Sequence, residues 1–225
     1  MQGTLTVSAA ASLTDAFGAM ERAFEAAHPG VRVSINFGAS STLAAQIIDG
    51  APVDVFASAD PPNMTKVSDA GLLLGPPVTF ATNSLRIIVR RGNPSGIRGL
   101  TDLAGAGIVY VTCPTDVPIG KYASQALQRA GVTVAPRSLE PDVKGIVAKV
   151  VAGEADAGIV YATDVAATKG TATGIDIPAS QNVTASYPIA TLKDTRNPAV
   201  AQAWIDFVLS PEGRSILREY GFGAP

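Results

Sequence analysis

Two stretches near the start of the chain share one design. In each, an apolar strand is followed by a turn of small residues that includes serine, and the turn leads directly into a helix. The first covers residues 4–17 and the second covers residues 33–47. A helix N-terminus presents unpaired N–H groups and a partial positive charge, and a serine there adds a hydroxyl donor. Two such ends that meet at one point would hold an anion without any lysine or arginine.

Strand and helix patterns alternate along nearly the whole chain, which favours an α/β fold with mainly parallel strands. Helices are expected over residues 13–27, 42–49, 62–70, 142–152 and 197–220, the last one broken near residues 210–211, and another helix is expected to have Pro118 at its first position. Strands are expected over residues 31–37, 53–57, 107–112 and 157–161.

Two long extended runs, residues 80–90 and 186–192, are candidates to cross from one lobe of the molecule to another. Two crossing strands imply two lobes. The sequence therefore predicts a first lobe of residues 1–82 plus 189–225 and a second lobe of residues 83–188.

Composition excludes several classes of function. The chain has 225 residues, of which 47% are apolar and 16% charged, so it can bury a substantial core, and its net charge of −2 without a basic run argues against nucleic acid. A single cysteine, Cys113, and a single histidine, His28, exclude the common zinc sites and most histidine-based triads. A small hydrolase or transferase is therefore the weaker hypothesis, which a turnover assay would test.

The start of the chain carries no signal peptide, because Met1-Gln2-Gly3 leads at once into a strand. This start fits a cytosolic protein, and it equally fits a mature form whose leader has been removed and to which a start methionine was added. No apolar run is long enough to span a bilayer.

Serines at the two strand–helix turns have two interpretations. Ser12 has Asp15 three residues later, which resembles a capping box, and Ser40 and Ser41 are equally suited to cap a helix. A ligand role is the alternative, because the carboxyl edge of an open parallel sheet is where ligands usually bind.

The second lobe offers a matching set of groups. Residues 117–120 and 141–144 are both helix starts, whose contribution would come from backbone N–H groups. Tyr161 ends a buried strand, where its phenol would either point into a cleft or form part of the core.

Five segments together resemble the substrate-binding proteins of molybdate ABC transporters. They are residues 9–14, 37–44, 53–60, 117–123, and the pair 142–143 with 158–164, and the closing residues 220–222 also look like that family. Each segment is weakly specific alone, whereas their order and spacing cover essentially the whole chain.

This resemblance implies a two-lobed periplasmic-binding-protein fold of type II, with two crossover strands and the ligand in the interlobe cleft. It implies molybdate or tungstate as the ligand, neutral donors around it, no cofactor, no direct cation ligand and no enzymatic activity. Carried over by motif, Ser12 and Ser40 would each give a hydroxyl and a backbone N–H, Ile119 and Val143 would give backbone N–H groups, and Tyr161 would give its phenolic hydroxyl. Ile119 departs from the small residue often found in that turn.

The resemblance also implies where the protein works and with what. A monomer outside the cytoplasm would deliver its ligand to the membrane permease of an ABC transporter, with a removed leader that ended in a lipid-anchored cysteine as one possibility. A sulfate-binding or other oxyanion-binding protein is the close alternative. The ligand-sensing domain of a regulator is a third reading, but its usual DNA-binding helix-turn-helix has no room in 225 residues.

Overall fold

The computed structural model describes residues 1–225, and the chain divides into two compact units. Unit 1 comprises Met1–Thr82 and Ser186–Pro225, and unit 2 comprises Asn83–Ala185. Strands β4 (Val78–Arg90) and β9 (Thr184–Thr191) each contribute residues to both units, as expected of crossing strands. The sequence-based division places the second boundary after residue 188, and the contacts place it after residue 185, within the same strand.

Unit 1 is built on four strands in the order β2-β1-β3-β9. The first three are β1 (Gly3–Ala10), β2 (Val31–Gly38) and β3 (Val55–Ala57). Strand β1 pairs in parallel with both β2 and β3, whereas β9 runs antiparallel to β3.

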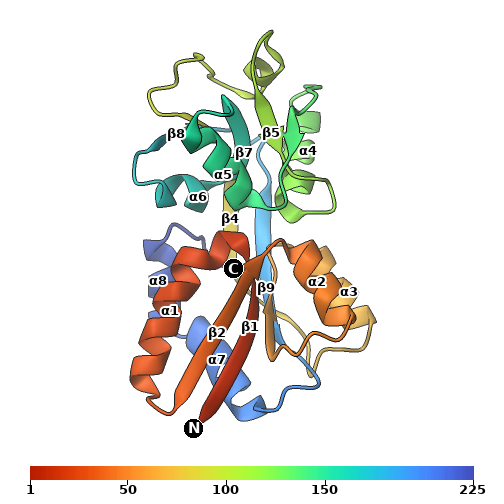
Figure 1. Cartoon of the computed structure of the whole chain (residues 1–225), viewed down its shortest axis with the longest axis vertical. Coiled ribbons are helices and arrows are strands. Elements are labelled where there is room, and N and C mark those ends of the chain that lie inside the picture. The colour runs from red at the N-terminus through yellow and green to blue at the C-terminus, as the bar shows by residue number, and fades with distance from the viewer. The chain divides into compact units, whose positions relative to one another are not determined.

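Helices cover both faces of this sheet (Figure 1). They are the 3₁₀ helix η1 (Ala11–Leu13) with α1 (Thr14–Ala27), α2 (Ser40–Ile48), α3 (Pro61–Asp69), α7 (Pro198–Leu209) and α8 (Pro211–Glu219). Figure 1 shows α1, α7 and α8 on one side of the strands and α2 and α3 on the other. Each face therefore has its own core.

The core beneath α1 and α7 is aromatic. The ring of Trp204 meets Phe17 and Phe24 edge-on, with centroid distances of 5.7 and 5.3 Å. The opposite core is mainly aliphatic and packs α2 and α3 against β3 and β9. Its buried members are Leu43, Ala44, Ile47, Phe56, Met64, Val67, Ala190 and Leu192. In the aromatic core, edge-on pairs such as those of Trp204 are each worth about 0.5–1.5 kcal/mol beyond the burial of their surface.

Unit 2 repeats the same design with the remaining strands of the nine-stranded sheet. Its strands are the second part of β4, then β5 (Tyr110–Thr112), β6 (Ser138–Leu139), β7 (Ala157–Tyr161) and β8 (Ala172–Asp176). Strand β5 is parallel to β6 and β7, and β4 is antiparallel to β7 and β8. The accompanying helices are η2 (Leu100–Ala104), α4 (Pro118–Arg129), α5 (Val143–Ala152) and α6 (Ala162–Ala167).

The break in the C-terminal helical tail has a local cause. Pro211 is the first residue of α8, and the hydroxyl of Ser210 accepts the N–H of Gly213 at 3.1 Å, so Ser210 caps the new helix. The predicted break at residues 210–211 is confirmed. None of the helices is both long and apolar enough to cross a lipid bilayer.

Asp156 joins three parts of unit 2. Its carboxylate accepts hydrogen bonds from Arg90 Nη2 at 2.6 Å, Ser95 Oγ at 2.9 Å and the Val109 N–H at 2.9 Å. Burial acts to raise the pKa of Asp156, but these donors together outweigh it and lower the pKa below its ordinary value. Such a carboxylate stabilises the fold above its unfolded-state pKa of about 3.9, and this stabilisation is lost as the pH falls through the lower folded-state value.

We therefore expect Asp156→Asn to lower the free energy of unfolding of unit 2 by about 1–3 kcal/mol at pH 7, because it removes a charged acceptor that is largely buried. The difference from the parent protein should shrink as the pH is lowered below about 4. Urea denaturation followed by circular dichroism at several pH values measures the loss of unfolding free energy and its pH dependence. The control is Asp176→Asn, which breaks an ion pair with Arg86 on a carboxylate that is 80% exposed and should change little. A difference in unfolding free energy between Asp156→Asn and the parent that stays the same at all pH values would contradict a stabilising role of the ionised Asp156 carboxylate.

Candidate functional site

The three parallel strands of unit 1 end at one edge of the sheet. Ala9 of β1 is in register with both Phe37 of β2 and Ala57 of β3, and Ala10 is in register with Gly38. The residues that follow the strands therefore emerge side by side. They lead into η1, α2 and the turn before α3, so this edge gathers both serines singled out from the sequence.

Ser12 lies within η1 and is 6% exposed. Its Oγ is 3.0 Å from Oη of Tyr187 on β9, which is itself fully buried. Helix α1 has Leu13 as its N-cap residue, with no side-chain cap. The capping interpretation of Ser12 is therefore wrong, because its hydroxyl is used in a contact with a residue 175 positions away.

Ser40 is the first residue of α2, which begins two residues earlier than residue 42, where the sequence pattern placed it. The N-cap position belongs to Ala39, so Ser40 does not cap the helix either. Instead, its Oγ accepts the N–H of Ala59 at 2.9 Å. Since Ser40 follows β2 and Ala59 follows β3, this bond ties together the segments after the two strands that flank β1.

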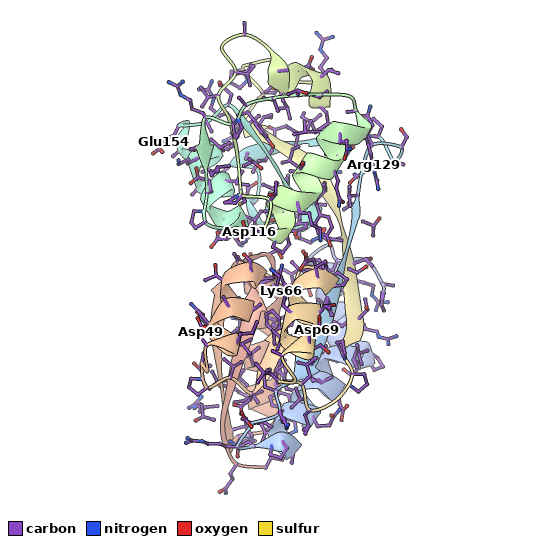
Figure 2. All side chains as sticks on the ribbon, turned by 90° about the vertical axis from the view of Figure 1, so that its right-hand side faces the viewer. Asp49, Lys66, Asp69, Asp116, Arg129 and Glu154 are labelled. Atoms are coloured by element: carbon purple, nitrogen blue, oxygen red, sulfur yellow. The ribbon has the colours of Figure 1, made fainter.

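The turn after β3 forms a polar network that the sequence analysis did not assign to the site. Ser58 Oγ donates to the Asp60 carbonyl at 2.8 Å, and Asp60 Oδ1 accepts from Nδ2 of Asn63 at 2.8 Å. Asn63 in turn accepts from Nζ of Lys66 at 2.9 Å, and Figure 2 labels this lysine on α3. Asp60 caps α3 through the N–H of Asn63. The network holds the turn that places Ala59 against Ser40, and the Asp60-Pro61 pair was its only sequence signal.

Unit 2 has an edge of the same kind. Val111 of β5 is in register with both Ser138 of β6 and Gly158 of β7. Helices α4, α5 and α6 follow these three parallel strands, and Figure 2 labels Asp116 in the turn that leads into α4. Ile119 is the second residue of α4, Val143 is the first residue of α5, and Tyr161 is the last residue of β7.

Ile119 is the second residue of α4, after the predicted N1 proline, Pro118. The first intrahelical bond comes from the Lys121 N–H to the Val117 carbonyl at 3.0 Å, so the N–H of Ile119 precedes the helical ladder. Gly120 allows this close turn, because a Cβ there would lie 2.1 Å from the Pro114 carbonyl oxygen. The side chain of Ile119, which is larger than the small residue often found in this turn, is buried.

Val143 is the first residue of α5 and is buried. Asp142 caps this helix, and its Oδ1 accepts the N–H groups of Lys144 at 2.8 Å and Gly145 at 3.2 Å. The cap therefore uses the second and third N–H groups of the helix. The N–H of Val143 remains at the free helix end, where the partial positive charge is largest.

Tyr161 is the N-cap residue of α6, and its N–H donates to Asp164 Oδ2 at 3.2 Å. The other oxygen of Asp164 lies 3.5 Å from Nζ of Lys144, which links α5 and α6. The side chain of Tyr161 is only 1% exposed.

Cys113 lies just after β5 at the same edge and is buried. Burial, followed by the charges of nearby carboxylates of which Asp142 and Glu140 contribute most, raises the pKa of its thiol to about 12. The thiol is therefore protonated at neutral pH. No group of three or more histidine, cysteine, aspartate or glutamate side chains is placed to hold a metal ion.

Each unit thus brings neutral hydrogen-bond donors to one sheet edge. In unit 1 they are the hydroxyl-bearing Ser12 and Ser40, and in unit 2 they are Ile119 and Val143 at helix starts together with the phenol of Tyr161. Such donors are suited to an anion. All five were singled out from the sequence as candidate ligands and remain a prediction, whereas the sequence did not indicate Tyr187 or Ala59, which contact Ser12 and Ser40.

Comparison with known proteins places the chain in a family. The model of the bacterial extracellular solute-binding proteins matches residues 5–223. The molybdate-binding protein ModA of Mycobacterium bovis is 40% identical over 222 residues, which cover 99% of this chain and 85% of that protein.

Solved structures share the fold. The periplasmic molybdate-binding protein of Azotobacter vinelandii superposes with a TM-score of 0.84 at 24% identity, over 98% of this chain and 99% of that one. The sulfate-binding protein SubI of Mycobacterium tuberculosis superposes with a TM-score of 0.85 at 21% identity, over 98% of this chain and 86% of that one. The periplasmic-binding-protein fold with two crossing strands, predicted from the sequence, is confirmed.

The raised thiol pKa leads to a prediction about Cys113. At pH 8 a thiol with a pKa near 12 is ionised to only about one part in ten thousand, and the thiolate is the reactive form. We expect the folded protein to react with iodoacetamide or a disulfide reagent far more slowly than the urea-unfolded chain, whose thiol has a pKa of about 8.5. The unfolded chain is the control, and equal reaction rates in the two states would contradict this prediction.

Proposed function

Since this chain belongs to the bacterial extracellular solute-binding proteins, which capture a solute and do not transform it, we propose that it binds molybdate and delivers it to an ABC importer. The observation that carries this proposal is the similarity, along nearly the whole chain, to a protein named for molybdate binding. The fold agrees with this role, but it also occurs in the sulfate-binding structure and does not by itself select the anion.

The proposed ligands are the five residues first identified from the sequence. Ser12 and Ser40 each donate a hydroxyl and a backbone N–H, Ile119 and Val143 donate backbone N–H groups, and Tyr161 donates its phenolic hydroxyl. The positions of these residues at helix starts beyond the parallel strands, or in the case of Tyr161 at the end of one, support the assignment, because helix starts offer N–H groups that have no helical partner.

The chemistry of these donors favours a dianion without protons. All five residues contribute N–H or O–H groups, which a fully deprotonated tetrahedral anion satisfies. Phosphate near neutral pH retains a proton, and burying a P–O–H group that lacks an acceptor costs about 1–3 kcal/mol. Sulfate carries no such proton, so it must be rejected by size.

Several finer features complete the proposal. Tungstate, a tetrahedral dianion of the same kind, is bound as well. The protein acts as a monomer outside the cytoplasm, with the membrane permease of the transporter as its partner. A leader that anchors the mature protein through a lipid-modified cysteine is consistent with this location.

Calorimetric titration with four anions tests the ligand. We expect tight 1:1 binding of molybdate and tungstate and far weaker binding of sulfate, and we expect that a large excess of phosphate at pH 7 does not displace molybdate. Equal affinity for sulfate and molybdate would contradict the proposed specificity and support a general oxyanion-binding protein. Efficient displacement by phosphate would show that the site contains an acceptor.

Hydroxyl deletions test the donors. Hydrogen bonds to a charged partner are worth about 1.5–3 kcal/mol, so Ser12→Ala, Ser40→Ala and Tyr161→Phe should each weaken molybdate binding by about ten- to a hundredfold. Ser41→Ala on the same helix and Tyr110→Phe in unit 2 are matched controls and should bind like the parent. Thermal unfolding should accompany each titration, because Ser40→Ala also deprives the Ala59 N–H of its acceptor. Parent-like binding by Tyr161→Phe would assign that residue to the core alone.

A further inference from the structure

We infer that Tyr187 is a positioning residue that fixes the hydroxyl of Ser12 as a donor, and that it thereby makes the site selective for oxyanions without a proton. This inference rests on the proposed function, because it concerns how one proposed ligand residue presents its hydrogen. Neither the sequence motifs nor the comparisons assign a role to Tyr187.

The contact between the two hydroxyls carries the inference. Ser12 Oγ and Tyr187 Oη are 3.0 Å apart, and both residues are buried. A serine hydroxyl has one hydrogen and two lone pairs, so it donates in one direction only. A phenol, with a pKa near 10, is a stronger acid than an alcohol and is therefore the better donor of the pair. Tyr187 then donates to Ser12, and the hydrogen of Ser12 is left for the anion.

The ring of Tyr187 is held in place by aromatic contacts. Phe222 meets it edge-on with a centroid distance of 5.4 Å, and Phe80 does so at 6.2 Å. The C-terminal segment that carries Phe222 is itself anchored by two backbone bonds between Gly223 and Thr82, of 2.9 and 3.0 Å. The last residues of the chain thus limit how far the phenol can move away from Ser12.

Ser40 shows the same arrangement with a backbone donor. Its Oγ accepts the N–H of Ala59, which can only donate, so the hydroxyl hydrogen of Ser40 must point elsewhere. A lone pair of each serine is therefore occupied from within unit 1. Each hydroxyl is left with one hydrogen and one lone pair, which favours donation to a deprotonated anion, whereas a serine without such a partner rotates freely and accepts more readily from a protonated oxyanion.

The test compares molybdate and phosphate in Tyr187→Phe. Without the phenol, Ser12 can rotate, so molybdate affinity should fall by about three- to tenfold. The affinity for phosphate, measured by direct titration at high phosphate concentration, should instead rise by about tenfold. Removing the hydroxyl of Ser12 should abolish the effect of Tyr187→Phe on phosphate affinity. Ser12→Ala and the double variant Ser12→Ala/Tyr187→Phe should therefore show the same phosphate discrimination.

A matched control and a second variant keep the result interpretable. Tyr110→Phe removes another buried phenol, in unit 2, and should leave both affinities unchanged. If Tyr187→Phe folds poorly, Phe222→Leu retains the phenol but loosens its ring, and it should shift discrimination in the same direction by a smaller factor.

Two outcomes would overturn the inference. Equal losses of molybdate and phosphate affinity in Tyr187→Phe would assign Tyr187 a purely structural role, and so would an unchanged molybdate affinity with unchanged discrimination. Either result leaves the proposed function intact as long as the parent binds molybdate tightly. Failure of the parent itself to bind molybdate would instead contradict the proposed function.

Discussion

Parallel pairing within each unit is the constraint on which the candidate site depends. Because β1 pairs in register with both β2 and β3, the segments after these strands must begin at one edge of the sheet. The same holds for β5 with β6 and β7 in unit 2. Helices that start at such an edge present their N–H groups together. Each unit therefore has a set of neutral donors as a direct result of its topology.

Neutral donors alone do not define selectivity, because a hydroxyl both donates and accepts. The surroundings of the two serines reduce this ambiguity, because a partner within unit 1 occupies one side of each hydroxyl. Ser40 accepts a backbone N–H, and Ser12 is paired with a phenol whose ring is packed between two others. Packing in the unit 1 core thus decides the direction of hydrogen bonds at the sheet edge, which links the stability of the fold to the proposed choice of anion.

The acidic residues at both sheet edges cap helices and do not belong to the proposed ligand residues. Asp60 caps α3, Asp142 caps α5, and Asp164 accepts the N–H of Tyr161 at the start of α6. Each carboxylate is thereby held by backbone N–H groups, which fixes the first turn of its helix. At α5 this cap uses the N–H groups after Val143 and leaves the first one at the helix end.

Local pattern determined much of this protein. The alternation of strands and helices, the two crossing strands, the N1 proline of α4 and the break at Ser210 and Pro211 follow from periodicity and turn chemistry, which act over a few residues. The five proposed ligand residues were likewise located by motif. The starts of several elements differ from the predicted ones by two or three residues, as in α2 and β5, because the ends of helices and strands are also set by contacts beyond the local pattern.

Only the tertiary structure decided how the hydroxyls are used and which short strands form. Ser12 and Ser40 look like helix caps in sequence, yet their partners are Tyr187 and Ala59, which the fold brings from elsewhere in the chain. Strands β6 and β8 were not expected, because β6 has only two residues and β8 contains a glycine and ends in an aspartate, residue types that are uncommon in strands. A hydrogen bond between residues 175 positions apart leaves no local trace, since it depends on the packing of β9 and the C-terminal segment and not on the residues beside the serine.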